Sequence, residues 1–167
     1  MTYTEFDIAL KKHLASLTDD EQRTLAIRIC KKLFFHYHAF HEKTAWGDPD
    51  VLLDAIAMCD RIGPTGHSGS ELLDVIAKVD EITPDTSDFE DANLALNACV
   101  AIHYMLHFLL DGDAQHLYYV CTSFYDTVDA IIQEDGTLPD EEIDNHPLMV
   151  ETRSQLLGSP FHIIHSI

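Results

Sequence analysis

Apolar residues recur every three or four positions along most of the chain, which is the spacing of one face of an amphipathic helix. These repeats predict helices over residues 4–16, 18–44, 49–62, 68–84, 88–110, 114–134 and 147–157. One further helical turn is expected to begin at Asp140. We therefore predict an all-α protein, a single-domain bundle of about seven helices over residues 1–167, in which residues 158–167 form a short apolar C-terminal tail.

Several of the predicted helices begin at recognisable capping signals. Thr18 and Glu21 have the spacing of a capping box, in which each side chain accepts a hydrogen bond from the other residue's backbone. Asp48 stands before Pro49, which combines a side-chain acceptor with a ring preset for the first turn. Thr4 is expected to cap the first helix.

Residues 88–110 form the segment that looks most buried. Its polar side chains fall on one narrow stripe, and every other face is apolar, which predicts a helix surrounded by neighbours. The stripe consists of Asn93, Asn97, His103, His107 and Asp111. The longest apolar run, "ACVAIHYMLHFLL", has about 13 residues and two histidines, so we expect no membrane span.

Composition and charge narrow the classes of ligand. The 167 residues are 46% hydrophobic, enough for a substantial core. A net charge of −19 argues against nucleic acid and against an anionic membrane surface, since both require Lys and Arg. The N-terminus lacks the pattern of a secretory signal, and the four cysteines stand singly in apolar segments. We predict a cytoplasmic protein with reduced thiols.

The charge is distributed unevenly along the chain. Residues 1–43 carry seven basic and six acidic side chains, whereas residues 79–152 carry 17 acidic side chains and no Lys or Arg. A surface selected for solubility alone mixes both signs, because uncompensated repulsion lowers stability. The asymmetry indicates a face that meets a basic partner.

No motif identifies an active site or a cofactor. His103 and His107 stand one helical turn apart and could share a metal ion, but no third ligand of recognisable spacing accompanies them. The loop "GPTGHSGSE" lacks the lysine of a phosphate-binding loop. We therefore predict no catalytic residue, no cofactor and no metal, and retain His103 and His107 as the weak metal candidates.

Three blocks of the sequence resemble the YjaG-like family (domain of unknown function 416). They are "YHAFHEKTAWGDPDVLLDAIAMC", "DANLALNACVAIHYMLHFLLDGD" and "LPDEEIDNHPLMVET". The first contains Tyr37, Phe40, Thr44, Gly47 and Asp48 at the spacing of the family pattern. The resemblance extends over most of residues 20–157 and implies an all-helical fold. It brings no catalytic residue with it.

These observations favour a non-enzymatic binding protein. The specific hypothesis is a bacterial immunity protein that neutralises a cognate toxin by covering its basic active-site cleft. The expected partner-binding residues are Tyr119, Asp126, Asp129, Glu134, Asp135, Asp140, Glu141, Glu142 and Asp144. Tyr118 and Tyr125 are further candidates for aromatic anchors. The alternatives are a metal-binding protein or enzyme that uses His103 and His107, and a homodimer or larger scaffold assembled through the apolar tail.

Overall fold

The computed structural model describes residues 1–62 and 68–161, and these residues form eight α-helices and no strand. In chain order they are α1 (Tyr3–Ser16), α2 (Asp19–Thr44), α3 (Pro49–Arg61), α4 (Gly69–Glu81), α5 (Asn93–Asp111), α6 (Ala114–Ile132), α7 (Asp140–Asn145) and α8 (Pro147–Leu156). The predicted all-α class is confirmed. The eighth helix is the turn expected at Asp140, which forms α7.

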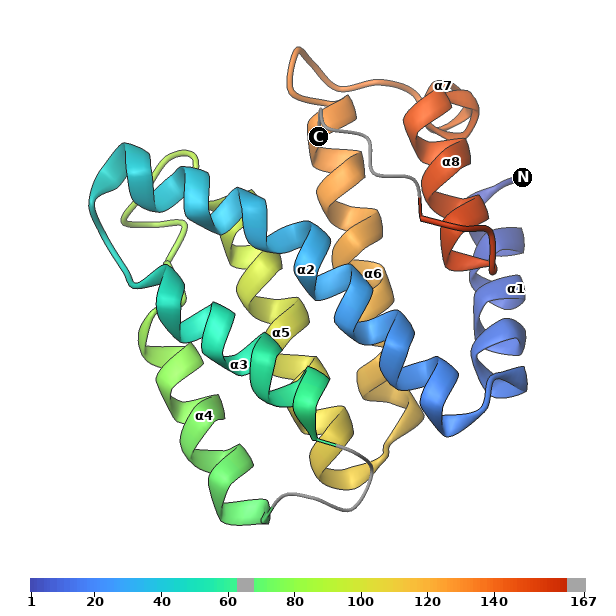
Figure 1. Cartoon of the computed structure of the whole chain (residues 1–167). Helices are drawn as coiled ribbons and strands as arrows, with labels where there is room; N and C mark the ends of the chain where they lie inside the picture. The colour runs from blue at the N-terminus through green and yellow to red at the C-terminus, as the bar shows by residue number, and fades with distance from the viewer. Residues whose placement is uncertain (63–67, 162–167) are drawn as a thin grey trace.

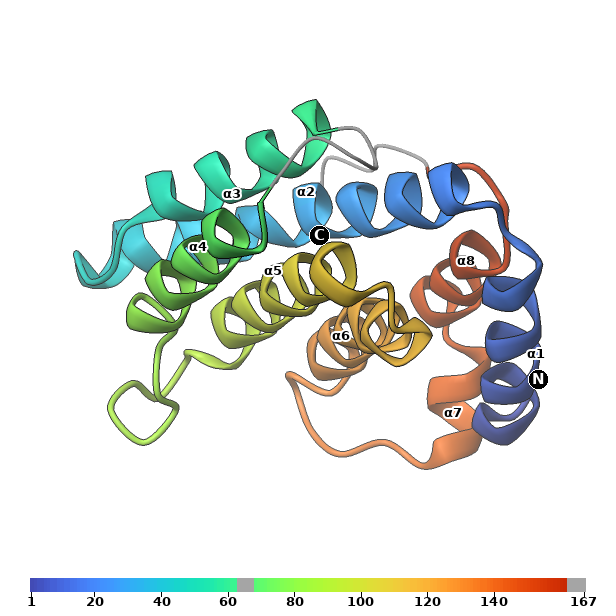
Figure 2. The same ribbon diagram turned by 90° about the horizontal axis from the view of Figure 1, so that it is seen from below.

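The helices are arranged around the antiparallel pair α5 and α6. α2 crosses one side of this pair along its whole length, with α3 and α4 beside α5 and with α1, α7 and α8 beside α6 (Figures 1 and 2). Within the described residues, no helix covers the opposite side of α5 and α6 (Figure 2). The architecture therefore leaves one face of the central pair open to solvent.

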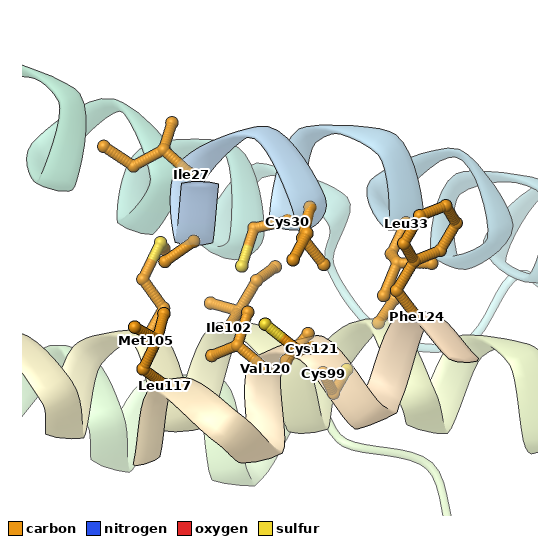
Figure 3. Packing of buried hydrophobic residues seen from close by; sticks show 14 of the residues in the cluster. Ile27, Cys30, Leu33, Cys99, Ile102, Met105, Leu117, Val120, Cys121 and Phe124 are labelled. Carbon is orange, nitrogen blue, oxygen red and sulfur yellow. The ribbon is translucent and has the colours of Figure 1, made fainter. Parts of the chain in front are cut away.

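The core lies between α2 and the pair α5–α6. Cys30 and Leu33 of α2 point toward α5 and α6 (Figure 3). The residues that meet them include Ile102, Met105, Leu117, Val120, Cys121 and Phe124, all of which are almost completely buried (Figure 3). As predicted, α5 is surrounded on most sides, and it contacts α2, α3, α4 and α6.

α5 is also the helix whose hydrophobicity bears on membranes. Its 19 residues are long and apolar enough, by length and composition, to cross a bilayer, and they exceed the run of about 13 considered from the sequence. A core helix of a globular protein meets the same criterion. The packing of α2, α4 and α6 against α5 accounts for its apolar faces.

The capping signals explain most of the helix starts. Thr18 Oγ1 accepts a hydrogen bond from the Glu21 backbone N–H at 3.3 Å, and the Glu21 carboxylate accepts one from the Thr18 N–H at 2.8 Å. Asp48 caps α3 by accepting from the Asp50 N–H at 3.0 Å. The expected cap at Thr4 is wrong. Thr2 caps α1, because it forms its own capping box with Glu5.

The block that contains Tyr37 and Gly47 is architectural. The buried Tyr37 hydroxyl donates to the Ile82 carbonyl at 2.8 Å and accepts from the Asp48 N–H at 3.2 Å. A Cβ on Gly47 would lie 2.1 Å from that hydroxyl oxygen, and the backbone of Gly47 has a φ of +81°. One phenol thus joins α2, the cap of α3 and the end of α4, and the glycine makes room for it.

The connection between α4 and α5 is longer than the sequence suggested. α5 begins at Asn93 rather than near residue 88. The preceding residues instead place Phe89 against the rings of Phe40 and Trp46, with centroid distances of 5.2 and 5.4 Å. This packing holds the connection against the end of α2 and the start of the α2–α3 turn.

The C-terminal tail begins by docking on the bundle. Phe161 stacks on Phe124 of α6 at a centroid distance of 6.0 Å. The alternative of self-assembly depends on the tail, and residues 162–167 of this tail lie outside the described residues. Residues 63–67 of the loop before α4 also lie outside them. Assembly through the tail stays a prediction.

Candidate functional site

The positive charge of the protein is concentrated on α2. Five of the ten Lys and Arg residues lie on this helix, and two of them form ion pairs with other elements. Lys31 contacts Asp60 and Lys43 contacts Asp91, each at 2.7 Å. These ion pairs mix acidic and basic side chains, as expected of an ordinary solvated surface.

Arg153 is the one Lys or Arg residue after Lys78, and it lies inside the fold. Its side chain is 4% exposed. The guanidinium donates to the Tyr125 hydroxyl at 2.9 Å, to the Asp144 carboxylate and to the Met1 carbonyl. It also lies 5.5 Å from the centre of the Phe6 ring. The surface formed by residues after 78 therefore has no exposed Lys or Arg in the part of the chain that the structure describes.

The predicted partner-binding carboxylates lie along α6, the connection after it and α7. We call Asp126, Asp129, Glu134, Asp135, Asp140, Glu141 and Glu142 the α6–α7 acidic surface. All are exposed except Asp129, which is half-buried. Asp129 and Asp140 line one pocket of about 480 Å³ together with Tyr3, Gln133 and Asp144. The fold thus brings carboxylates from two helices to one place.

Asp144 has a different role from the one expected. Its carboxylate is 18% exposed and pairs with Arg153, so its charge is used within the fold. A carboxylate that compensates a buried cation contributes little free charge to an incoming partner. Asp144 therefore belongs to the support beneath the α6–α7 acidic surface.

The ionised form of Asp126 is destabilised in the folded protein. Its pKa is raised, first because the surrounding protein reduces its hydration and second because Asp129 repels its ionised form. The side chain is nevertheless exposed. Unlike the carboxylates near α2, it receives no ion pair from a Lys or Arg among the described residues.

The three tyrosines proposed as anchors differ in accessibility. Tyr119 is 37% exposed and remains available to a partner. Tyr118 is half-buried and donates its hydroxyl hydrogen bond to Asp7 at 2.7 Å. Tyr125 is buried and accepts from Arg153, so it cannot insert into another protein. Of these residues, Tyr119 alone keeps the geometry of an anchor.

A cluster of aromatic and histidine rings from α5 and α6 lies beside Tyr119. Tyr104 of α5 is 4.7 Å from Tyr119 and 5.7 Å from His116, measured between ring centroids. His107 lies 5.4 Å from His116 and 4.5 Å from His103. We call these five residues the ring ladder. Sequence reasoning identified His103, His107 and Tyr119 but missed Tyr104 and His116, which the antiparallel contact of α5 with α6 brings next to them.

The ring ladder does not form a metal site in this arrangement. Two of its histidine rings contact carboxylates through Nδ1, His103 with Asp80 at 2.8 Å and His116 with Asp111 at 3.0 Å. Among residues 1–62 and 68–161, however, no three His, Cys, Asp or Glu side chains are placed to hold one ion. A ring that bound a metal would therefore need to change its position.

The cysteines offer no activated nucleophile. All four are buried and unpaired. Burial raises the pKa of the Cys59, Cys99 and Cys121 thiols to about 12, and it raises that of Cys30 well above its ordinary value. A reactive cysteine requires the opposite shift, toward the thiolate. These thiols are part of the core between α2, α3, α5 and α6.

Comparison with known proteins places the chain in a family. The sequence profile described as "protein of unknown function (DUF416)" matches residues 9–157. The chain belongs to the DUF416 family. A crystal structure of a DUF416 family protein from Shewanella baltica OS155 is similar to it, with a TM-score of 0.77 and 25% sequence identity over 88% of this chain and 81% of that chain. No curated protein matches the chain.

DUF416 membership confirms the resemblance found in the sequence, and the structure explains the residues that carry it. Tyr37 and Gly47 fix the turn into α3. In the last block, Ile143 is buried and His146 caps α8 by accepting from the Leu148 N–H at 3.2 Å. These positions maintain the fold. The acidic surface and the ring ladder are built on top of it.

Proposed function

We propose that this DUF416 protein is a non-enzymatic binding protein whose α6–α7 acidic surface binds a basic protein. The observation that carries the proposal is the burial of Arg153, which leaves residues 79–161 without an exposed Lys or Arg of their own. A one-signed surface accelerates association with a partner of opposite charge by roughly ten- to a thousand-fold. The raised pKa of Asp126 supports the proposal, because this carboxylate repels its neighbour and has no cation of its own.

The class of partner that suits this surface best is a toxin with a basic active-site cleft. A domain that cleaves nucleic acid, or uses nucleotides, needs Lys and Arg to hold phosphates. An acidic helical surface can cover such a cleft and exclude the substrate. The protein would then act in the cytoplasm as the immunity partner of that toxin, without a cofactor and without chemistry of its own.

The exposure of each residue indicates whether it would contribute to the association rate or to the affinity of the interface. Carboxylates at the rim of an interface steer association, whereas rings that become fully desolvated contribute most of the affinity. Glu141 and Glu142 are exposed on the first turn of α7 and suit the first role. Tyr119 is exposed on α6, seven residues before Asp126, and suits the second.

The test begins with capture of the partner from the native cell by wild-type protein, followed by association kinetics at several salt concentrations. A variant that carries Asp126→Lys, Asp129→Lys, Glu141→Lys and Glu142→Lys should associate at least about ten-fold more slowly. Its rate should also lose most of its salt dependence, because the complementary field is gone. The circular dichroism spectrum should stay helical.

A matched control reverses four exposed carboxylates elsewhere, namely Glu42, Asp54, Asp74 and Glu81 on α2, α3 and α4. The control changes the net charge by the same amount, so a loss shared by both variants would be a general charge effect. We expect the control to retain most of the wild-type rate. Equal association rates and equal salt dependence for wild type and the α6–α7 variant would refute the proposed surface.

A further inference from the structure

The ring ladder offers aromatic π faces, which the α6–α7 acidic surface lacks. Five centroid distances between 4.5 and 5.7 Å connect His103, His107, His116, Tyr104 and Tyr119 into one cluster across α5 and α6, and one of them joins His103 to Tyr104 at 5.2 Å. Tyr119 is exposed and the other four rings are half-buried, so the cluster is accessible from solvent. Tyr119 lies seven residues before Asp126 on α6, a spacing that puts both side chains on one face of the helix. The ring ladder therefore adjoins the α6–α7 acidic surface.

Two carboxylates lie beside the ladder and orient its rings. Asp80 of α4 contacts His103 Nδ1 at 2.8 Å, and Asp111 contacts His116 Nδ1 at 3.0 Å. A carboxylate that contacts Nδ1 fixes the orientation of the imidazole ring. Each carboxylate still has acceptor capacity, since one oxygen alone contacts the histidine. The surface thus offers π faces with carboxylates at both sides.

His107, which contacts both other histidines of the cluster, is neutral at physiological pH. Burial lowers the pKa of His107, and repulsion from His103 and His116 lowers it further, while Asp111 and Asp80 act in the opposite direction. The neutral His107 ring does not repel a positive group. The ladder is therefore compatible with a cationic ligand at neutral pH.

We propose that the ring ladder binds arginine side chains of the basic partner. This inference rests on the proposed function and names the group that is recognised. A guanidinium stacks flat on Tyr and His rings and donates to a flanking carboxylate at the same time, whereas the ammonium of lysine is a compact charge that cannot stack. The ladder would thus select arginine, while the α6–α7 acidic surface attracts either residue.

Other ligands fit the same surface less well. A nucleobase could stack on the rings, but its phosphate would meet the carboxylates of Asp80 and Asp111 beside them. A metal ion would need three converging donors, which the described residues do not supply in this arrangement. Arginine satisfies both the rings and the carboxylates.

The experiment is a titration of ¹⁵N-labelled protein with hexaarginine and hexalysine peptides at neutral pH, with EDTA present to keep the histidines free of metal. Hexaarginine should shift the amide resonances of the ring ladder and should bind roughly two- to five-fold more tightly than hexalysine, which corresponds to an exposed cation–π contact. Hexalysine should shift resonances mainly in the α6–α7 acidic surface.

Two variants test the rings separately. Tyr119→Leu and His107→Leu each remove one π face and keep an apolar side chain, so if one variant is poorly folded the other still gives an answer. Each should lower the affinity for hexaarginine toward that for hexalysine and leave hexalysine binding unchanged. The matched control is Phe35→Leu, which removes an exposed ring on α2 outside the ladder.

The outcomes separate the two proposals. Equal affinities of the wild-type protein for both peptides, or an arginine preference that survives in both ladder variants, would overturn the role of the ladder and leave the acidic surface intact. Failure of both peptides to bind would count against the acidic surface itself, and therefore against both proposals.

Discussion

Arg153 and Asp144 form an ion pair in which the cation is almost completely buried. The arginine side chain is 4% exposed and the aspartate side chain is 18% exposed. The pair joins α8 to the end of α7, and through Tyr125 it also reaches α6. A charge that might have neutralised the acidic surface is therefore used to assemble the helices beneath it.

Removing the cation should be costly. Arg153→Met leaves Asp144 without its cation and the Tyr125 hydroxyl without its donor, so we expect a loss of about 3–5 kcal/mol in the free energy of unfolding. Urea denaturation followed by circular dichroism measures the change. Arg153→Lys should also destabilise, because an ammonium cannot reach Tyr125 and Asp144 with the same forked geometry. A Met variant as stable as wild type would show that the pair is dispensable.

The contact between Tyr37 and Gly47 predicts a second stability effect. Tyr37→Phe leaves the Ile82 carbonyl and the Asp48 N–H without their partner and should cost about 1–3 kcal/mol. Gly47→Ala should cost at least as much, because its Cβ would overlap the hydroxyl and its φ is positive. The matched control is Gly112→Ala, which has a positive φ but open space around the new Cβ. In thermal unfolding, Gly47→Ala should lower the melting temperature more than Gly112→Ala does.

Asp126 should oppose folding when it is ionised. Because its pKa is raised in the folded protein, the penalty is absent below the ordinary aspartate pKa of about 4 and grows as pH rises through the folded value. Asp126→Asn should therefore stabilise the protein at pH 7, with a difference that disappears in acid. Denaturation curves across this range measure it. Asp135→Asn, in the exposed connection after α6, serves as the control, and an equal gain there would indicate a general charge effect.

His36 and His107 should make the protein less stable in mild acid. Burial lowers the pKa of both side chains, so the unfolded chain takes up protons before the folded chain does. Stability is then complete above about pH 6.5 and falls as the pH drops toward the folded pKa values. His36→Gln should reduce this dependence while leaving stability at pH 8 nearly unchanged. An identical pH profile in the variant would contradict the assignment to His36.

Local signals explain how much of the fold could be predicted from the sequence. The capping box of Thr18 and the Asp48–Pro49 start depend on neighbours within a few residues, and both are correct. The cap at Thr2 could have been found in the same way, since Glu5 stands three residues later. The late start of α5 could not, because the packing of Phe89 on Trp46 joins distant parts of the chain.

The arrangement of the candidate site could not be predicted without knowing the tertiary structure. Nothing in the sequence separates Asp144 from Glu142, yet one carboxylate is paired with a buried arginine and the other is exposed. Similarly, Tyr104 and His116 become neighbours only when the contact register of α5 against α6 is known. The charge asymmetry could be predicted from the sequence because it is a property of composition. The buried Arg153–Asp144 pair beneath the acidic surface, and the ring ladder beside it, depend on how the helices pack.

The Tyr37 hydroxyl has a consequence for how relatives of this protein can change. Because the oxygen occupies the space of a side chain at position 47, the two positions constrain each other. A relative that loses the phenol gains room for a Cβ but loses the link between its second, third and fourth helices. We expect the two residues to be exchanged together or not at all, so their covariation across an alignment would measure how strictly the family depends on this one oxygen.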